Sequence, residues 1–364
     1  MIYKKYGKTG KDISVIGFGG MRFPKVNGEY DYDKCAEFVV KANELGVNYF
    51  DTAPGYCDDH SEKIMAHAFK MMKNPFYVST KCSERDGTKL RKTLETSLKR
   101  MNLEKINFFH IWCILDIDDY RSRMVKGGAY ETALKAKEEG LIEHITFSTH
   151  CSGDEIETIV NEGCFEGMTV GYNIINFPFR QKGLKAAYEK GLGIATMNPL
   201  GGGLIPQKAD YFDFIRGADD KTVVDAAIKF NASHDEITTV LCGMGSMEEV
   251  IQNCKIGNSL VKLDENKLKE IEKRLFSSMD KLCTGCRYCE HCPKGIPVSK
   301  FMLSYNNHIL GDTKGIYDYL RYHWGINYKQ ANECISCGLC ERKCTQHLPI
   351  ISRLKETYEW GTEY

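Results

Sequence analysis

The chain of 364 residues is too long for one small domain and suits a large domain followed by a smaller one. Its 49 basic and 49 acidic residues balance, so the charge points to neither nucleic acid nor a membrane surface as a partner. No apolar run is long enough to span a bilayer, and Met1-Ile2-Tyr3-Lys4-Lys5 lacks the apolar core of a signal peptide, so we expect a cytoplasmic protein.

Short β-branched and aromatic runs alternate with amphipathic stretches through the first 260 residues, which is typical of a parallel sheet with crossover helices. We expect strands at residues 13–18, 47–53, 76–81, 106–112, 143–149, 168–173, 193–198 and 238–242. Helices are expected at residues 32–45, 59–72, 88–100, 129–139, 153–162, 181–190, 221–233 and 247–256. Eight strand–helix units in about 250 residues predict an α/β fold of the (β/α)8 TIM-barrel type. A doubly wound sheet is the alternative, but Gly17-Phe18-Gly19-Gly20 matches its phosphate loop only weakly.

In a TIM barrel the functional groups lie at the carboxyl ends of the strands. The predicted ends here carry polar and aromatic side chains, namely Asp51 and Tyr56, Lys81 and Cys82, His110 and Trp112, and Ser148 to His150. We therefore expect the site of chemistry among these residues.

The 16 cysteines indicate metal or redox chemistry rather than a disulfide scaffold, because the cytoplasm keeps thiols reduced. Half of them form two close groups in the last quarter of the chain: Cys283, Cys286, Cys289 and Cys292, then Cys334, Cys337, Cys340 and Cys344. Three cysteines at this spacing can bind three corners of a 4Fe–4S cubane, with the fourth ligand supplied from elsewhere. Two zinc sites are the alternative, but zinc needs four thiolates at each site.

In two-cluster ferredoxins the fourth cysteine of each run binds the other cluster. We therefore expect one cluster on Cys283, Cys286, Cys289 and Cys344, and a second on Cys334, Cys337, Cys340 and Cys292. Two residues rather than three precede Cys292, and Thr345 replaces the usual proline after Cys344, but neither change removes a ligand. These motifs predict a barrel over residues 1–276 and a small, mainly helical, ferredoxin-like domain over residues 277–364.

Several motifs in residues 1–258 resemble the aldo-keto reductases: Tyr6-Gly7-Lys8-Thr9-Gly10, Asp51-Thr52-Ala53-Pro54-Gly55-Tyr56, Ser79-Thr80-Lys81 and Asn198-Pro199-Leu200-Gly201-Gly202-Gly203. Together with the clustered cysteines, they resemble the branch of that family that is fused to a ferredoxin-type domain. In the family, a tyrosine donates a proton to a carbonyl as hydride arrives from a nicotinamide, a lysine lowers the tyrosine pKa, and an aspartate orients the lysine. The resemblance assigns these roles to Tyr56, Lys81 and Asp51. An inert ion pair beside a packed tyrosine is the alternative interpretation.

The family also has a histidine at the end of the fourth strand, where this sequence has Trp112. His110 lies two residues earlier, so it faces the same side of the strand one layer deeper. It either takes the family's catalytic role or is a buried barrel histidine. If no histidine takes this role, the site lacks the group that polarises the carbonyl oxygen of the substrate.

The resemblance places a nicotinamide near Ser148, Thr149 and Thr169, and the rest of the cofactor near Pro199, Leu200, Gly201 and Gly243. The threonines replace the family's Asn and Gln, and Glu249 stands where the family has basic residues for an NADP 2′-phosphate. If a nicotinamide binds, NAD(H) is therefore favoured over NADP(H). Three single cysteines follow the predicted strands closely: Cys57, Cys82 and Cys113. They are either soft ligands or reactive thiols of the site, or small buried apolar side chains, and we favour the buried apolar role.

Two functions are consistent with these features. The first is an oxidoreductase in which two 4Fe–4S clusters pass single electrons to or from a barrel site that acts on a small organic substrate. The second is an electron-transfer or docking module whose barrel has lost catalysis. The expected protein partner is a ferredoxin or another redox protein. A flavin that couples one-electron to two-electron steps is not excluded, although no sequence feature locates one.

Overall fold

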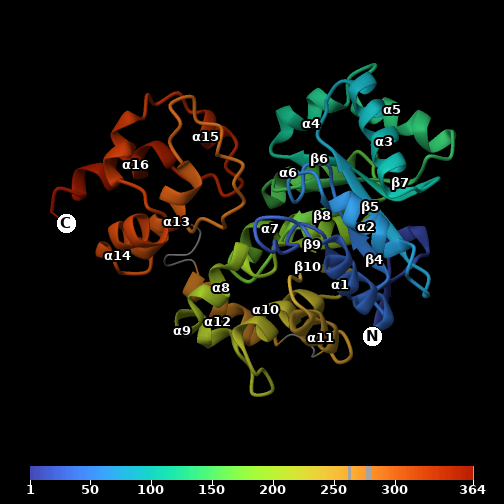
Figure 1. Ribbon diagram of the computed structural model, residues 1–364, viewed down its shortest axis with the longest axis horizontal. Helices are drawn as coiled ribbons and strands as arrows, with labels where there is room; N and C mark the ends of the chain where they lie inside the picture. Colours follow the sequence, from blue (N-terminus) through green and yellow to red (C-terminus); the bar gives the residue numbers. More distant parts are fainter. Residues whose placement is uncertain (261–263, 276–280, 364) are drawn as a thin grey trace. The chain divides into compact units, whose positions relative to one another are not determined.

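The computed structural model describes residues 1–260, 264–275 and 281–363 (Figure 1). The chain divides into two compact units, one formed by Met1–Pro199 with Arg216–Leu263, the other by Leu200–Ile215 with Asp264–Tyr364. The predicted domain boundary after residue 276 lies outside the described residues. In the described part of the chain, no helix has the length and apolar character needed to cross a membrane.

Within the described residues, eight parallel strands close the first unit into a barrel, in the order β10-β3-β4-β5-β6-β7-β8-β9 (Figure 1). They are β3 (Ile16–Gly19), β4 (Tyr49–Asp51), β5 (Tyr77–Cys82), β6 (Ile106–Ile114), β7 (Ile142–Thr149), β8 (Gly167–Gly171), β9 (Gly193–Met197) and β10 (Thr239–Cys242). The predicted TIM barrel is confirmed, and the doubly wound sheet was wrong. The first predicted strand is divided, because β2 (Asp12–Ser14) pairs with β1 (Tyr3–Lys5) in a hairpin and only β3 joins the barrel.

The predicted helices are present as α1 (Tyr32–Glu44), α2 (Ser61–Phe69), α3 (Gly87–Met101), α5 (Ala129–Glu138), α6 (Gly153–Asn161), α7 (Phe177–Glu189), α10 (Val223–Ala232) and α11 (Met247–Ile256). Side chains cap several of them; Ser152 and Glu155, for example, form a reciprocal capping box at α6. Helix α7 begins earlier than predicted because its proline, Pro178, lies in the first turn, where no amide donor is needed. A short helix, α4 (Ile117–Arg123), was not predicted.

The base of the barrel is filled by the Tyr6 ring, which precedes the turn η1 (Gly7–Thr9) and packs against Tyr49 and Phe108. Gly167 and Gly193 make room for this ring, since a Cβ atom on Gly167 would lie 2.5 Å from Tyr6 Cε1 and one on Gly193 would overlap the ring. The opposite, carboxyl ends of the strands remain available for a site.

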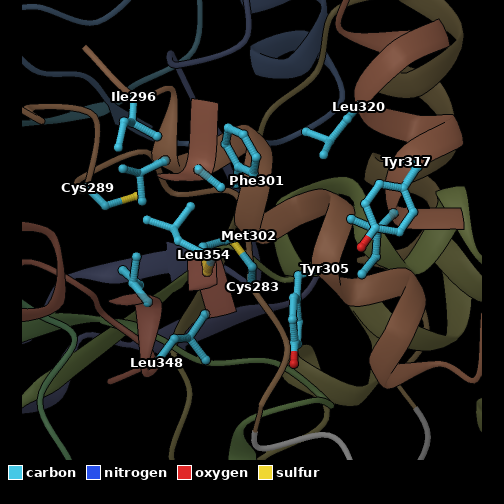
Figure 2. Close-up of a cluster of buried hydrophobic side chains, with 14 residues drawn as sticks. Cys283, Cys289, Ile296, Phe301, Met302, Tyr305, Tyr317, Leu320, Leu348 and Leu354 are labelled. Atoms are coloured by element: carbon cyan, nitrogen blue, oxygen red, sulfur yellow. The ribbon is translucent and has the colours of Figure 1, made fainter. Parts of the chain in front are cut away.

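The second unit is mainly helical, as predicted. Its helical segments are η2 (Gly201–Gly203), α8 (Leu204–Gln207), α9 (Ala209–Phe212), η3 (Asp213–Ile215), α12 (Glu265–Leu275), α13 (Val298–Ile309), α14 (Lys314–Asp318), η4 (Tyr319–His323), η5 (Tyr328–Glu333), α15 (Leu339–Arg342) and α16 (Ile350–Trp360). Figure 2 shows its apolar core, where Phe301 and Met302 of α13 lie among Leu354, Cys283 and Cys289. The cysteine segments are thus built into the core of this unit.

Candidate active site and iron–sulfur centres

Asp51 and Lys81 form a buried ion pair at the carboxyl ends of β4 and β5. Lys81 Nζ lies 2.5 Å from Asp51 Oδ2 and donates a second hydrogen bond of 2.8 Å to the carbonyl of Thr52. The hydroxyl of Ser79 donates to the other Asp51 oxygen. Lys81 is only 1% exposed, and burial lowers its pKa while the Asp51 carboxylate opposes that change. The parallel pairing of β4 with β5 therefore fixes a charged pair where water does not reach.

Tyr56 lies above this pair, in the loop between β4 and α2. Lys81 Nζ is 4.9 Å from the centroid of the Tyr56 ring, and the Trp112 ring meets Tyr56 edge-on at 5.6 Å between centroids. Burial, with the Asp51 charge as the next contribution, raises the pKa of Tyr56 well above its ordinary value. The resemblance implied the opposite direction. The difference arises because burial of the Tyr56 hydroxyl is the largest influence on its pKa.

The loop that carries Tyr56 is strained and held by polar contacts. Cys57, Asp58 and Asp59 all have positive φ angles, of 53°, 53° and 70°. Such angles are costly for residues with side chains. Both terminal guanidinium nitrogens of Arg100 donate hydrogen bonds to the Asp59 carboxylate, at 2.7 and 2.6 Å. The Cys57 thiol donates to the Gly20 carbonyl at 3.4 Å. These contacts fix the loop beside the Lys81–Asp51 pair.

His110 is fully buried, with threonine hydroxyls on both ring nitrogens. Its Nδ1 lies 2.8 Å from Thr146 Oγ1 and its Nε2 lies 3.4 Å from Thr169 Oγ1. Burial, followed by the Lys81 charge, holds the pKa of His110 well below its ordinary value. The structure therefore places His110 as a neutral histidine within the barrel. Trp112, not a histidine, adjoins Tyr56.

The three predicted nicotinamide-binding hydroxyls make hydrogen bonds within the protein. Ser148 accepts from the amide of Cys113 at 2.9 Å, Thr149 donates to the carbonyl of Ile114 at 2.9 Å, and Thr169 pairs with His110. The pairing of β6 with β7 shifts register between Ile111 and Ile114, where Cys113 has a φ of 60°. Ser148 and Thr149 thus bond backbone groups at this irregularity.

The remaining predicted cofactor residues are divided between the two units. Pro199 is the last residue of the Met1–Pro199 segment of the first unit, whereas Leu200 and Gly201 belong to the second unit. Gly243 lies against Arg22, since a Cβ atom added to Gly243 would be 2.6 Å from Arg22 Cγ. This exposed cation could not be placed beside Gly243 from the sequence, because Arg22 is far from Gly243 in the chain.

Four thiols of the second unit lie close together. Burial, and then the charges of Cys286, Cys289 and Cys344, raise the pKa of Cys283. These are the residues predicted to hold one cluster, including Cys344 from the other run. The amides of Gly285 and Leu348 donate to the sulfurs of Cys283 and Cys344, both at 3.4 Å, and the Thr345 hydroxyl lies 3.3 Å from the sulfur of Cys286. Metal binding deprotonates such thiols, so a raised pKa does not prevent ligation.

The second set of cysteines lies nearer the surface. Cys334 and Cys340 are half-buried. Among the described residues, Cys337 is the one cysteine that is exposed. Ile335 and Leu339, on either side of Cys337, are 56% and 40% exposed. Cys292 is half-buried against the core of the same unit, and its place in the second cluster stays a prediction.

The donor set fits 4Fe–4S clusters. Zinc requires four thiolates around a single ion, whereas a cubane is held by four thiolates spread over its irons. All-thiolate ligands with backbone amides directed at sulfur, inside an apolar core, suit the clusters.

Comparison with known protein families agrees with this architecture. The profile of the aldo/keto reductase family matches residues 15–275. The chain belongs to the aldo/keto reductase family. A 4Fe-4S dicluster domain matches residues 282–349, so this aldo/keto reductase is an oxidoreductase joined to an iron–sulfur domain. The predicted fused branch of the family is confirmed.

Similar proteins share the barrel. L-galactose dehydrogenase of Arabidopsis thaliana is 25% identical over 73% of this chain and 92% of its own length, and the NADH-specific methylglyoxal reductase of Escherichia coli is 25% identical over 55% of this chain and 67% of its own. Among solved structures, the aldo-keto reductase AKR11C1 of Bacillus halodurans has a TM-score of 0.63 at 20% identity, over 75% of this chain and 96% of its own. An aldo-keto reductase of Klebsiella pneumoniae in complex with NADPH has a TM-score of 0.62 at 17% identity, over 76% and 96%.

Proposed function

We propose that this aldo/keto reductase interconverts a small carbonyl compound and its alcohol at Tyr56, with electrons exchanged through its 4Fe–4S clusters. The observation that carries the proposal is the buried Lys81–Asp51 pair, with Lys81 Nζ 2.5 Å from the carboxylate and 4.9 Å from the Tyr56 ring centroid. A buried charge pair at the functional end of a TIM barrel is costly to maintain, and perturbed groups of this kind cluster at active sites. The names of the Arabidopsis and Escherichia coli relatives, a dehydrogenase and a reductase, support the same substrate class.

Tyr56 is proposed to supply the proton for oxygen. Reduction of a carbonyl to an alcohol takes up two electrons and two protons: the C=O π bond breaks, and a C–H and an O–H bond form. A tyrosine phenol is protonated at neutral pH, and the raised pKa makes Tyr56 a weaker acid, so it holds its proton until the substrate oxygen has become strongly basic. It then donates that proton and recovers one from water, while the proton for carbon comes from solvent.

When bound, each 4Fe–4S cluster would supply or accept one electron, so two clusters would match the two-electron reaction. Lys81 places a cation against the Tyr56 ring, and Asp51 balances its charge. The exposed side chains of Ile335 and Leu339 border Cys337, so this part of the surface suits brief docking of a ferredoxin-class electron carrier. That carrier supplies or accepts the electrons in this proposal.

A nicotinamide is the alternative source of electrons, since the Klebsiella relative was solved with NADPH and the Escherichia coli relative is named as NADH-specific. In this chain the hydroxyls of Ser148, Thr149 and Thr169 already bond other groups of the barrel. A ligand that needs the Thr149 hydroxyl as a donor would break its bond to the Ile114 carbonyl, at a cost of about 1 kcal/mol. This cost favours the clusters as the electron source.

The proposal is tested with pre-reduced protein in an anaerobic stopped-flow instrument. Dithionite-reduced protein, freed of excess reductant, is mixed with a panel of aldehydes and ketones, and the visible absorption of the oxidised clusters is followed. At least one carbonyl class is expected to reoxidise the clusters. Tyr56→Phe is expected to slow this step at least about 100-fold, the lower range of general acid catalysis, with unchanged iron content.

The matched control is Tyr30→Phe, which removes a phenol whose hydroxyl donates to Asp58 at 3.4 Å. It is expected to react at the normal rate. A Tyr56→Phe protein as fast as Tyr30→Phe contradicts the role of Tyr56. If no carbonyl reoxidises the clusters and no alcohol reduces them, the barrel is a docking module without catalysis, which is the second function consistent with the sequence.

A further inference from the structure

The loop after β9 is built into the iron–sulfur unit. Leu200–Ile215 associates with Asp264–Tyr364 rather than with the barrel strands on either side of it in sequence. Lys208 Nζ donates to Asn307 Oδ1 at 2.6 Å, and the neighbouring Asn306 makes two hydrogen bonds of 2.8 Å with the backbone of Cys283. Helix α13 therefore links this loop to the first cluster ligand.

Within this loop, Gly202 lies directly against Thr284, the residue between Cys283 and Gly285. A Cβ atom on Gly202 would overlap the Thr284 carbonyl oxygen, and one on Gly285 would lie 4.0 Å from the Gly202 carbonyl. Gly202 also has a φ of 72°, a conformation that favours glycine. The two backbones approach as closely as they do because position 202 has no side chain.

The Thr284 hydroxyl is buried and has no hydrogen-bond partner among the residues that the structure describes. Thr284 is 1% exposed, and its Oγ1 makes no hydrogen bond with the described residues. A buried hydroxyl in this situation is costly, so native proteins almost always provide an acceptor. Thr284 stands between two predicted ligands of the first cluster, Cys283 and Cys286, and the sulfurs of that cluster are acceptors within this motif.

We propose that the Thr284 hydroxyl donates a hydrogen bond to a sulfur of the first cluster, and that Gly202 fixes Thr284 in the position from which it does so. Leu200–Gly203 then serves as a support for the cluster motif and not as a cofactor loop for a nicotinamide. A hydrogen bond to sulfur stabilises the more negative, reduced cluster, so it raises the reduction potential. Thr284 and Gly202 are positioning residues in this proposal. It does not depend on turnover at Tyr56.

The first experiment replaces Thr284 in the full-length protein and measures the midpoint potential of the first cluster by anaerobic titration with electron paramagnetic resonance. The signals of the two clusters are assigned with Cys289→Ala and Cys340→Ala. Thr284→Val, which keeps the shape without the hydroxyl, is expected to shift the reduction equilibrium about tenfold toward the oxidised form, a fall of about 59 mV for one electron. Thr284→Ser is expected to restore the potential. An unchanged potential in Thr284→Val overturns the proposal.

The second experiment compares Gly202→Ala with Gly203→Ala. Both glycines have positive φ angles, 72° and 98°, but a Cβ atom on Gly203 meets only the end of the Gln207 side chain, at 3.4 Å. Gly202→Ala is expected to disturb the first cluster, with iron falling from about eight toward about four per chain and loss of its signal, whereas Gly203→Ala retains both clusters. Equal effects of the two changes would show that backbone strain, not contact with Thr284, is responsible. This comparison remains decisive if Thr284→Val fails to load its cluster.

Discussion

Replacement of Asp51 by Asn tests the buried charge pair on which the candidate active site depends. The change keeps the size of the side chain but leaves the Lys81 ammonium with only neutral oxygens, such as the Thr52 carbonyl, as its direct partners in the described structure. Lys81 is 1% exposed, so water does not compensate for the lost carboxylate. Breaking a buried ion pair on one side typically costs about 3–5 kcal/mol, and we expect the barrel of Asp51→Asn to lose that much stability.

The stability of Asp51→Asn is expected to depend on pH. Burial lowers the pKa of Lys81 in the folded protein, and Asp51 is the largest group that opposes this, so the variant lowers that pKa further. Between the folded pKa and about 10.4, the value of an unperturbed lysine, the unfolded chain binds more protons than the folded chain. The stability of Asp51→Asn therefore rises with pH across this window. The measurement is urea unfolding under anaerobic conditions, followed by hydrogen exchange in peptides from β4 and β5.

Two further variants decide the interpretation. Asp154→Asn is the control, because its ion pair with Lys182 spans 2.7 Å but both side chains are more than half exposed, and such pairs contribute about 1 kcal/mol or less. Lys81→Met in the Asp51→Asn background removes the unpaired charge and is expected to recover part of the loss. The buried pair does not stabilise the barrel in this way if Asp51→Asn lowers the free energy of unfolding no more than Asp154→Asn does, or if Lys81→Met recovers none of that loss.

The remaining predictions concern the clusters, the barrel histidine and the nicotinamides. Anaerobic analysis should give about eight irons and no stoichiometric zinc per chain; two zincs without iron would support the alternative metal sites. Cys344→Ala should abolish the signal of the cluster held by Cys283, and loss of the other signal instead would contradict crossed ligation. His110→Ala should slow cluster reoxidation by carbonyls less than Tyr56→Phe does, since both His110 nitrogens bond threonines; an equal loss would give it a catalytic role. In calorimetric titrations NADH should bind better than NADPH, since Glu249 accepts from the Gly245 amide at 2.7 Å and places a carboxylate there. Tighter NADPH binding that Arg22→Ala abolishes would instead assign the phosphate to Arg22.

The positions of the strands could be read from the sequence, and the cluster ligands could be predicted from it, because both depend on local pattern. Each barrel strand is a short apolar run between helices, so periodicity alone locates it within a few residues. The ligand runs are legible for a similar reason, since thiolates two residues apart can reach one cluster whatever lies around them. The division of residues 12–19 into β2 and β3 was missed, because a hairpin and a barrel strand present the same pattern until their pairing partners are known.

The electrostatics of the site required the tertiary structure. Family motifs suggested that Lys81 lowers the pKa of Tyr56, whereas burial raises that pKa, and burial is a property of packing. Only the fold brings Thr146 and Thr169 onto the ring of His110.

Two further contacts depend on chain segments that are distant in sequence. Arg22 reaches Gly243 because β3 and β10 are neighbours in the closed barrel. Gly202 meets Thr284 because the loop after β9 folds with the cysteine motifs and not with the strands that flank it. The sequence by itself determined the barrel and predicted the cluster ligands, whereas these contacts were decided by folding, because local pattern carries no information on which distant segments pack together.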